Sequence, residues 1–233
     1  MSKIVFLGDS ITKATDYGAV TLTDCFAYKV GTLAGYAPGE IINAGVSSDT
    51  SGGMLARITT DVIDKAPAVC VVMAMVNDVV QEVPIATYKE NLRAIASRLI
   101  LSGIKVVFVS PPLDRGTSTF QDKCRTYLEA LEAVSVEFSA PYIDCYREYA
   151  FMYLYGMGDF YACYVDSVHQ TKAGHDKLVS IMARGTRIKA FCPSTINPVP
   201  QDLTALVLSL ADYVLSCRTS SLLSNVANER AKF

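Results

Sequence analysis

Residues 4–11 of the chain read IVFLGDSI, an apolar run of four residues that stops at a glycine, an aspartate and a serine. A continuous apolar run of this length is typical of a strand that is buried on both faces of a parallel sheet. The glycine and the two small polar residues indicate a tight turn at the end of that strand. We therefore expect Ser10 to lie at the carboxyl edge of a central sheet, where folds of this kind place their sites.

Further apolar runs follow along the chain, and segments with helical spacing separate them. The runs are EIINAG (40–45), AVCVVMA (68–74), IKVVFVS (104–110) and PYID (141–144). Helical spacing occurs over residues 25–35, 52–65, 87–103 and 120–138. Strands that alternate with helices favour a three-layer α/β/α domain, here with a central parallel sheet of about five strands.

Composition limits the classes of function. The chain has 233 residues, a hydrophobic fraction of 51% and a formal net charge of −2, which fits one globular domain and no nucleic-acid partner. The cysteine count is seven, and no C-x-x-C motif occurs. We interpret the cysteines as small buried hydrophobic residues of a reducing compartment, with a disulfide framework or a zinc site as the alternative.

The first apolar run is too short for a signal peptide, and no later run is long enough to cross a membrane. We expect a cytoplasmic protein without a membrane span, while export by another route stays open.

Catalytic chemistry is indicated by the position of the two histidines, His169 and His175. His169 follows Asp166 by three residues, so a turn can place the carboxylate against the imidazole and leave Nε2 free to take the Ser10 proton. Backbone N–H groups after the first two strands and the amide of Asn77 could stabilise an oxyanion. We expect His175 to lie on the solvated side of a helix capped by Thr171.

Four blocks of the sequence, in order, resemble the GDSL/SGNH hydrolase superfamily of serine esterases. They are Gly8–Ile11, Asn43–Thr50, Val76–Asp78 and Asp166–His169. The resemblance implies a flavodoxin-like fold and a Ser10–His169–Asp166 triad that works through an acyl-enzyme without a cofactor. It also implies an oxyanion hole formed by Ser10, Ser48 and Asn77. Asp9 and Gly45 are further candidates for lining the substrate site.

The chain departs from the family pattern at two positions. Ser48 stands where many members have a glycine, and Met75 replaces the glycine of the third block. A backbone donor at residue 48 is kept if the local dihedral angles suit a serine. A methionine next to Asn77 would narrow the acyl pocket, and Tyr161 and Tyr164, just before Asp166, are expected to line the substrate site.

These features predict hydrolysis of a small-molecule or polysaccharide ester, with an O-acetylated carbohydrate as the first choice of substrate. A lipase, lysophospholipase or thioesterase with a longer acyl pocket is the alternative, and a catalytically silent carbohydrate-binding domain is a third reading. A metal cluster of Asp166, His169, His175 and Asp176 is disfavoured because its spacing matches no common zinc site. No metal is therefore predicted.

The character of the sequence changes near residue 192, so we divide the chain into a hydrolase domain, 1–192, and a tail, 193–233. The tail begins with a proline-rich link and continues as an amphipathic helix. Its apolar stripe, which we expect to pack on the domain or to form a homo-oligomer contact, consists of Leu203, Leu206, Val207, Leu210 and Val214.

Overall fold

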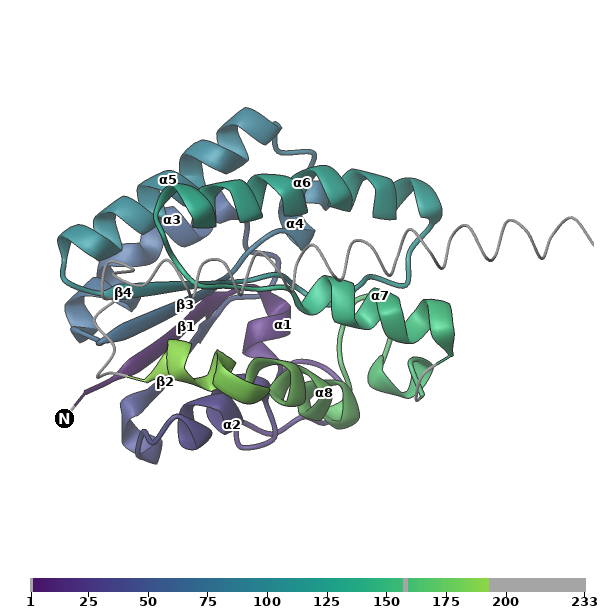
Figure 1. The fold of residues 1–233 in the computed structure, drawn as a ribbon, viewed down its shortest axis with the longest axis horizontal. Helices are drawn as coiled ribbons and strands as arrows, with labels where there is room; N and C mark the ends of the chain where they lie inside the picture. Colours follow the sequence, from purple (N-terminus) through teal and green to yellow (C-terminus); the bar gives the residue numbers. More distant parts are fainter. Residues whose placement is uncertain (1, 157–158, 193–233) are drawn as a thin grey trace, which may run out of the picture. The chain divides into compact units, whose positions relative to one another are not determined.

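The computed structural model describes residues 2–156 and 159–192 (Figure 1). The predicted tail, 193–233, lies outside the described residues, and so do its helix and its possible subunit contact. Both stay predictions, as does the division of the chain at residue 192.

The core of the fold is a five-stranded parallel sheet with the strand order β2-β1-β3-β4-β5. Its strands are β1 (Ile4–Gly8), β2 (Ile41–Gly45), β3 (Val69–Met73), β4 (Lys105–Val109) and β5 (Tyr142–Ile143). Each coincides with one of the apolar runs, which confirms the predicted flavodoxin-like sheet. In this order β2 lies on one side of β1, and β3, β4 and β5 follow on the other side, so the direction of winding reverses at β1. Open α/β sheets bind ligands in the crevice at the carboxyl ends of the strands where this reversal occurs.

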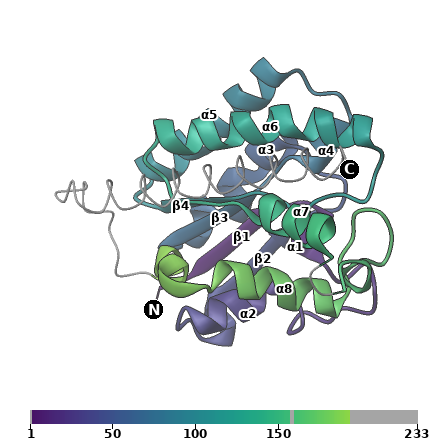
Figure 2. The ribbon, with the colours of Figure 1, turned by 45° about the vertical axis from the view of Figure 1, so that its right-hand side comes forward.

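Helices cover both faces of the sheet (Figures 1 and 2). On one face lie α3 (Ser51–Asp61), α5 (Ile85–Leu101) and α6 (Ser118–Glu137). The other face carries α2 (Phe26–Leu33) and α8 (Lys172–Met182), and α7 (Cys145–Tyr155) packs against α8. The four predicted helical segments correspond to α2, α3, α5 and α6, and the predicted three layers are confirmed.

Two short helices that the sequence analysis did not predict follow β1 and β3 directly. They are α1 (Ser10–Lys13) and α4 (Val76–Val80). Asp9 caps α1, because its side chain accepts a hydrogen bond from the Ile11 N–H at 2.9 Å. These helices turn the chain sharply at the carboxyl edge of the sheet and so fix the residues that begin them, Ser10 and Val76.

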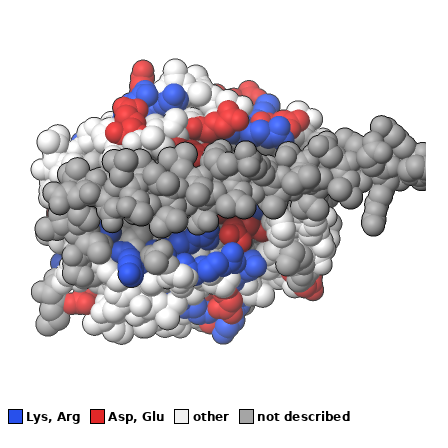
Figure 3. All heavy atoms as spheres, in the orientation of Figure 1, with Lys and Arg blue, Asp and Glu red and all other residues white. Residues whose placement is uncertain are grey.

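The interior and the surface fit a globular domain. Five of the cysteines, Cys25, Cys70, Cys124, Cys145 and Cys163, are buried with free thiols, as expected of small hydrophobic residues. On the face that Figure 3 shows, basic and acidic side chains of the described residues are intermixed. None of the described helices combines the length and the apolar character that crossing a bilayer requires.

Gly45 lets β2 approach α1 closely. An added Cβ at this position would lie 2.2 Å from the Lys13 backbone nitrogen and 2.6 Å from the Lys13 Cα. Gly45→Ala should therefore lower the free energy of unfolding by about 1–3 kcal/mol, the usual cost of overpacking. Urea denaturation measures this change. Gly39→Ala, where a Cβ would meet nothing within 4 Å, is the control; equal losses in the two variants would contradict the close-packing argument.

Candidate active site

Ser10 is the first residue of α1 and stands at the carboxyl end of β1. Its side chain is 7% exposed, so it lies just beneath the surface. The backbone N–H of a first helical residue has no partner inside its own helix. The strand-turn-helix junction thus places both the Ser10 hydroxyl and the Ser10 backbone N–H at one edge of the sheet.

His169 joins Ser10 to Asp166. Its Nε2 lies 3.0 Å from the Ser10 Oγ, and its Nδ1 lies 2.7 Å from one carboxylate oxygen of Asp166. The other oxygen of Asp166 accepts hydrogen bonds from the backbone N–H groups of Val168 and His169. Because the carboxylate is held by its own turn, Nδ1 carries the proton and Nε2 is left as the acceptor for Ser10.

Asp166 keeps its charge although part of it is buried. Burial by itself would raise the pKa of the carboxyl, but the hydrogen bonds from the His169 backbone, the imidazole and the Val168 backbone outweigh it. The net result is a pKa below the ordinary value. The carboxylate is therefore available to stabilise an imidazolium while His169 holds a proton.

Tyr17 is a neighbour of the catalytic base that the sequence analysis missed. Its ring stacks on the His169 imidazole with a centroid distance of 3.4 Å and an interplanar angle of 8°. The loop that carries Tyr17 is tied down next to the site, since Asp16 pairs with Lys13 and accepts from the Ser47 hydroxyl. The stacked ring fixes the plane of the imidazole and provides a π face to a cationic ring.

Two of the proposed oxyanion donors, Ser48 and Asn77, follow β2 and β3. Ser48 adopts a φ of 65°, the left-handed conformation that glycine takes most easily. The position that is often glycine in relatives thus keeps its backbone shape with a serine. Asn77, in the first turn of α4, donates its amide to the Asp49 carbonyl at 3.0 Å and lies 3.4 Å from an Asp9 oxygen.

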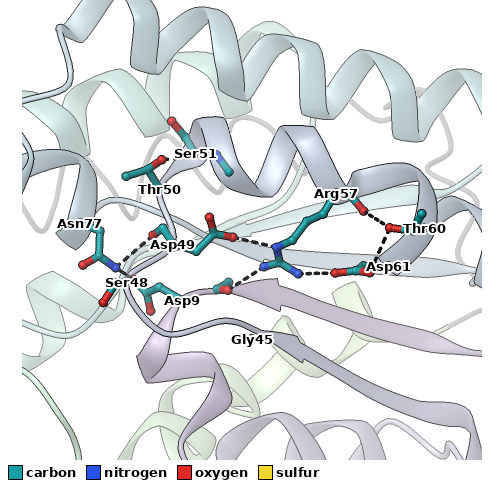
Figure 4. Close-up of polar contacts among 12 residues, drawn as sticks. Asp9, Gly45, Ser48, Asp49, Thr50, Ser51, Arg57, Thr60, Asp61 and Asn77 are labelled. Atoms are coloured by element: carbon teal, nitrogen blue, oxygen red, sulfur yellow. Dashed lines mark hydrogen bonds and ion pairs between the residues drawn. The ribbon is translucent and has the colours of Figure 1, made fainter.

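Arg57, on α3, organises this edge of the sheet (Figure 4). Its guanidinium donates to the Asp49 carboxylate at 2.7 Å, to Asp61 at 2.8 Å and to the Gly8 carbonyl at 3.0 Å. Figure 4 shows these bonds spreading from one side chain to the end of β1 and to the loop after β2. The sequence analysis missed Arg57, because its acceptors include a backbone carbonyl that no motif marks.

Two further acids lie beneath the site. Burial, assisted by the negative charges of Asp78 and Asp49, raises the pKa of Asp9 to about 7, although the bond from the Ile11 N–H opposes the shift. Burial also raises the pKa of Asp78, whose carboxylate accepts from the backbone and the hydroxyl of Ser51. These acids anchor α1 and α3, so they shape the site from below.

The structure corrects the expectation for His175. Thr171 caps α8 as expected, but His175 is 1% exposed and accepts a hydrogen bond from the Phe26 N–H at 3.3 Å. Burial, together with the positive charge of Lys29, lowers the pKa of His175 to about 4. His175 is therefore buried and not solvated. Of the two histidines, His169 is the one that contacts Ser10.

Of the residues expected to line the substrate site, Tyr161 is exposed, whereas Tyr164 and Met75 are buried. Tyr161 is 59% exposed, whereas Tyr164 is 5% exposed and donates its hydroxyl to the Leu113 carbonyl. Met75 is 1% exposed, so its side chain lies in the core instead of facing an open pocket. Gly45 packs against α1. Within residues 2–156 and 159–192, no three His, Cys, Asp or Glu side chains form a group that could hold a metal.

A flavodoxin-like sheet with a Ser–His–Asp chain at its carboxyl edge defines the class of SGNH-type serine ester hydrolases. The chain belongs to the GDSL-like lipase/acylhydrolase family, whose model matches residues 6–177. The predicted family is thereby confirmed. No protein in a collection of curated proteins matches the chain.

Several solved structures share the fold. Axe2, an acetylxylan esterase from Geobacillus stearothermophilus, superposes with a TM-score of 0.66 at 23% identity, covering 80% of this chain and 94% of its own. The acetyl xylan esterase AlAXEase gives a TM-score of 0.66 at 20% identity and covers 78% and 98%. LAE5, an alpha/beta hydrolase enzyme from the metagenome of Lake Arreo, Spain, gives 0.66 at 20% identity and covers 82% and 96%.

Ser10 and His169 should act as one unit. We expect Ser10→Ala and His169→Ala each to lower kcat on an activated ester by about 10⁴–10⁶-fold, and the double variant to lose little more, because each step needs both groups. Steady-state hydrolysis of p-nitrophenyl acetate measures this effect. A Ser10→Ala enzyme that keeps the unmodified kcat would contradict the assignment.

Asp9 should make the stability of the protein depend on pH. Its pKa is about 7 in the folded chain and about 3.9 in an unfolded one. Between these values only the folded state holds the proton, so this group lowers the free energy of unfolding by about 1.4 kcal/mol per pH unit as the pH rises. Asp9→Asn should remove that slope between pH 4 and 7, measured by urea denaturation.

The control for this comparison is Asp122→Asn, on the exposed side of α6, whose stability curve should run parallel to that of the unmodified chain. A parallel curve for Asp9→Asn as well would show that Asp9 is already ionised below pH 7 in the folded chain.

Proposed function

We propose that the chain is a carbohydrate O-acetylesterase that works through an acyl-enzyme on Ser10. The observation that carries the proposal is the continuous hydrogen-bonded chain, 3.0 Å from Ser10 to His169 and 2.7 Å from His169 to Asp166. Distances in this range fit direct proton transfer between a nucleophile and its base. The family to which the chain belongs supports the ester as the bond that is cleaved.

In the proposed mechanism, His169 Nε2 takes the Ser10 proton as Oγ forms a bond to the ester carbonyl carbon. The carbonyl electron pair moves onto oxygen, and the resulting tetrahedral intermediate returns it as the bond to the alcohol breaks. His169 gives its proton to the departing sugar oxygen, which leaves as a hydroxyl. Water, deprotonated by His169, then attacks the acetyl-enzyme, which releases acetate and returns a proton to the Ser10 Oγ.

The oxyanion of each intermediate would be held by the N–H groups of Ser10 and Ser48 and by the amide of Asn77. An asparagine amide has two hydrogens, and the Asp49 carbonyl accepts one of them at 3.0 Å. The second hydrogen makes the longer contact, 3.4 Å to an Asp9 oxygen, and an oxyanion beside it would share that hydrogen with Asp9. Donors fixed before the reaction stabilise the developing charge without reorganisation.

The choice of an acetylated carbohydrate is supported by the neighbours in the fold. Among these structures, two are acetylxylan esterases by name, and one Axe2 variant is described as an acetyl-xylooligosaccharide esterase. Catalytic mutants of Axe2 replace a serine, an aspartate and a histidine, the same three residue types that are joined here at Ser10, Asp166 and His169.

Acyl-chain length tests the proposal. On p-nitrophenyl esters from acetate to decanoate, kcat/KM should be highest for acetate and at least about tenfold lower for octanoate, since pockets discriminate by about 1–3 kcal/mol per methylene. Acetate release from an O-acetylated xylo-oligosaccharide should exceed that from p-nitrophenyl acetate at equal concentration. A preference for octanoate would instead support a lipase or thioesterase.

A further inference from the structure

A small hollow lies beside the loop that carries the catalytic base. It has a volume of about 120 Å³, and the residues that line it include Asp114, Arg115, Gln121, Tyr153, Phe160 and Tyr161. No step of the proposed mechanism uses these residues. The volume is below the 300–1,000 Å³ typical of pockets for drug-sized ligands, so it suits one ring.

The wall of this hollow is bonded directly to the catalytic loop. The Arg115 N–H donates to the Ser167 carbonyl at 2.8 Å, and the Arg115 guanidinium donates to the Asp166 carbonyl at 3.3 Å. Ser167 and Asp166 belong to the same turn as His169. The hollow therefore borders the turn that carries His169.

The lining combines an aromatic face with a buried carboxylate. Tyr161 is 59% exposed, and the Arg115 guanidinium lies over its ring at 5.0 Å from the centroid, which steadies the ring without covering it. Asp114 is 5% exposed, and one of its oxygens accepts from the Gly116 N–H. Within the described part of the chain, no protein group donates to its other oxygen. Burial raises the pKa of Asp114.

We propose that this hollow is a subsite for a sugar ring of the alcohol part of the ester. A sugar presents a flat C–H face, which suits Tyr161, and hydroxyl donors, which suit the open oxygen of Asp114. An acyl chain would cover the same carboxylate with no donor, and burying an unpaired carboxylate is costly. The inference rests on the proposed function, since it names the part of the substrate that the site holds.

The test compares two substrates of the intact chain, an O-acetylated xylotetraose and p-nitrophenyl acetate. In Tyr161→Ala the ratio of kcat/KM for the oligosaccharide to that for p-nitrophenyl acetate should fall tenfold or more, mainly through KM. Tyr161→Phe, which keeps the ring, should hold the ratio within threefold. Asp114→Asn, which keeps the shape but loses the charge, should lower the ratio about fivefold. Tyr155→Ala, a tyrosine on α7 with 52% exposure outside the hollow, is the matched control.

A second measurement separates this inference from the proposed function. Calorimetric titration of the unmodified chain with unacetylated xylotetraose should show binding that weakens tenfold or more in Tyr161→Ala, whether or not the ester is cleaved. If the chain does not cleave the acetylated oligosaccharide but this binding holds, the proposed function fails and the subsite stands. If Tyr161→Ala changes neither the ratio nor the titration, or if it selectively slows octanoate esters, the subsite is wrong.

Discussion

The Arg57 guanidinium donates to three acceptors that belong to three parts of the fold. The Gly8 carbonyl ends β1, Asp49 lies in the loop after β2, and Asp61 ends α3, the helix that carries Arg57 itself. A planar guanidinium with fixed donors can hold such acceptors at set angles, which a lysine cannot do. Because Ser10 follows Gly8 by two residues and Asn77 donates to the Asp49 carbonyl, the proposed nucleophile and the proposed oxyanion donor both adjoin acceptors of this side chain.

The charges around this arginine explain how several acids share one small region. Burial raises the pKa of Asp9 and that of Asp78; the negative charges of Asp78 and Asp49 add to the first shift, and the charge of Asp49 adds to the second. Arg57 pairs with Asp49, and burial raises the pKa of Asp9 to about 7. A neutral Asp9 beside Asn77 would not repel an oxyanion, whereas an ionised one would. The burial that destabilises the charge of Asp9 therefore favours the proposed chemistry.

The sequence predicted those features that are encoded locally. The five strands are continuous apolar runs, and the Asp166–His169 turn is four consecutive residues whose carboxylate is held by its own backbone. Tyr17 could not be predicted, because its contact with His169 joins segments far apart in the chain. Two of the Arg57 contacts, with Asp61 and Asp49, are local, but its bond to the Gly8 carbonyl joins distant segments. The place of His175 could have been foreseen, since it shares one face of α8 with Leu178 and Met182, all of them buried.

The His169 ring is held on three sides by groups of different chemistry, which explains how a loop at the surface can keep the ring in one orientation. Asp166 fixes one ring nitrogen, Ser10 lies at the other, and Tyr17 covers one face of the ring. The loops of Tyr17 and His169 are in close contact, since a Cβ on Gly18 would lie 2.5 Å from the Val165 side chain. With Asp166 47% exposed, solvent screens its charge, so orientation contributes more than electrostatic attraction. The stacked ring and the short turn supply that orientation, and they leave the neighbouring surface, with Arg115 and Tyr161, free to contact substrate.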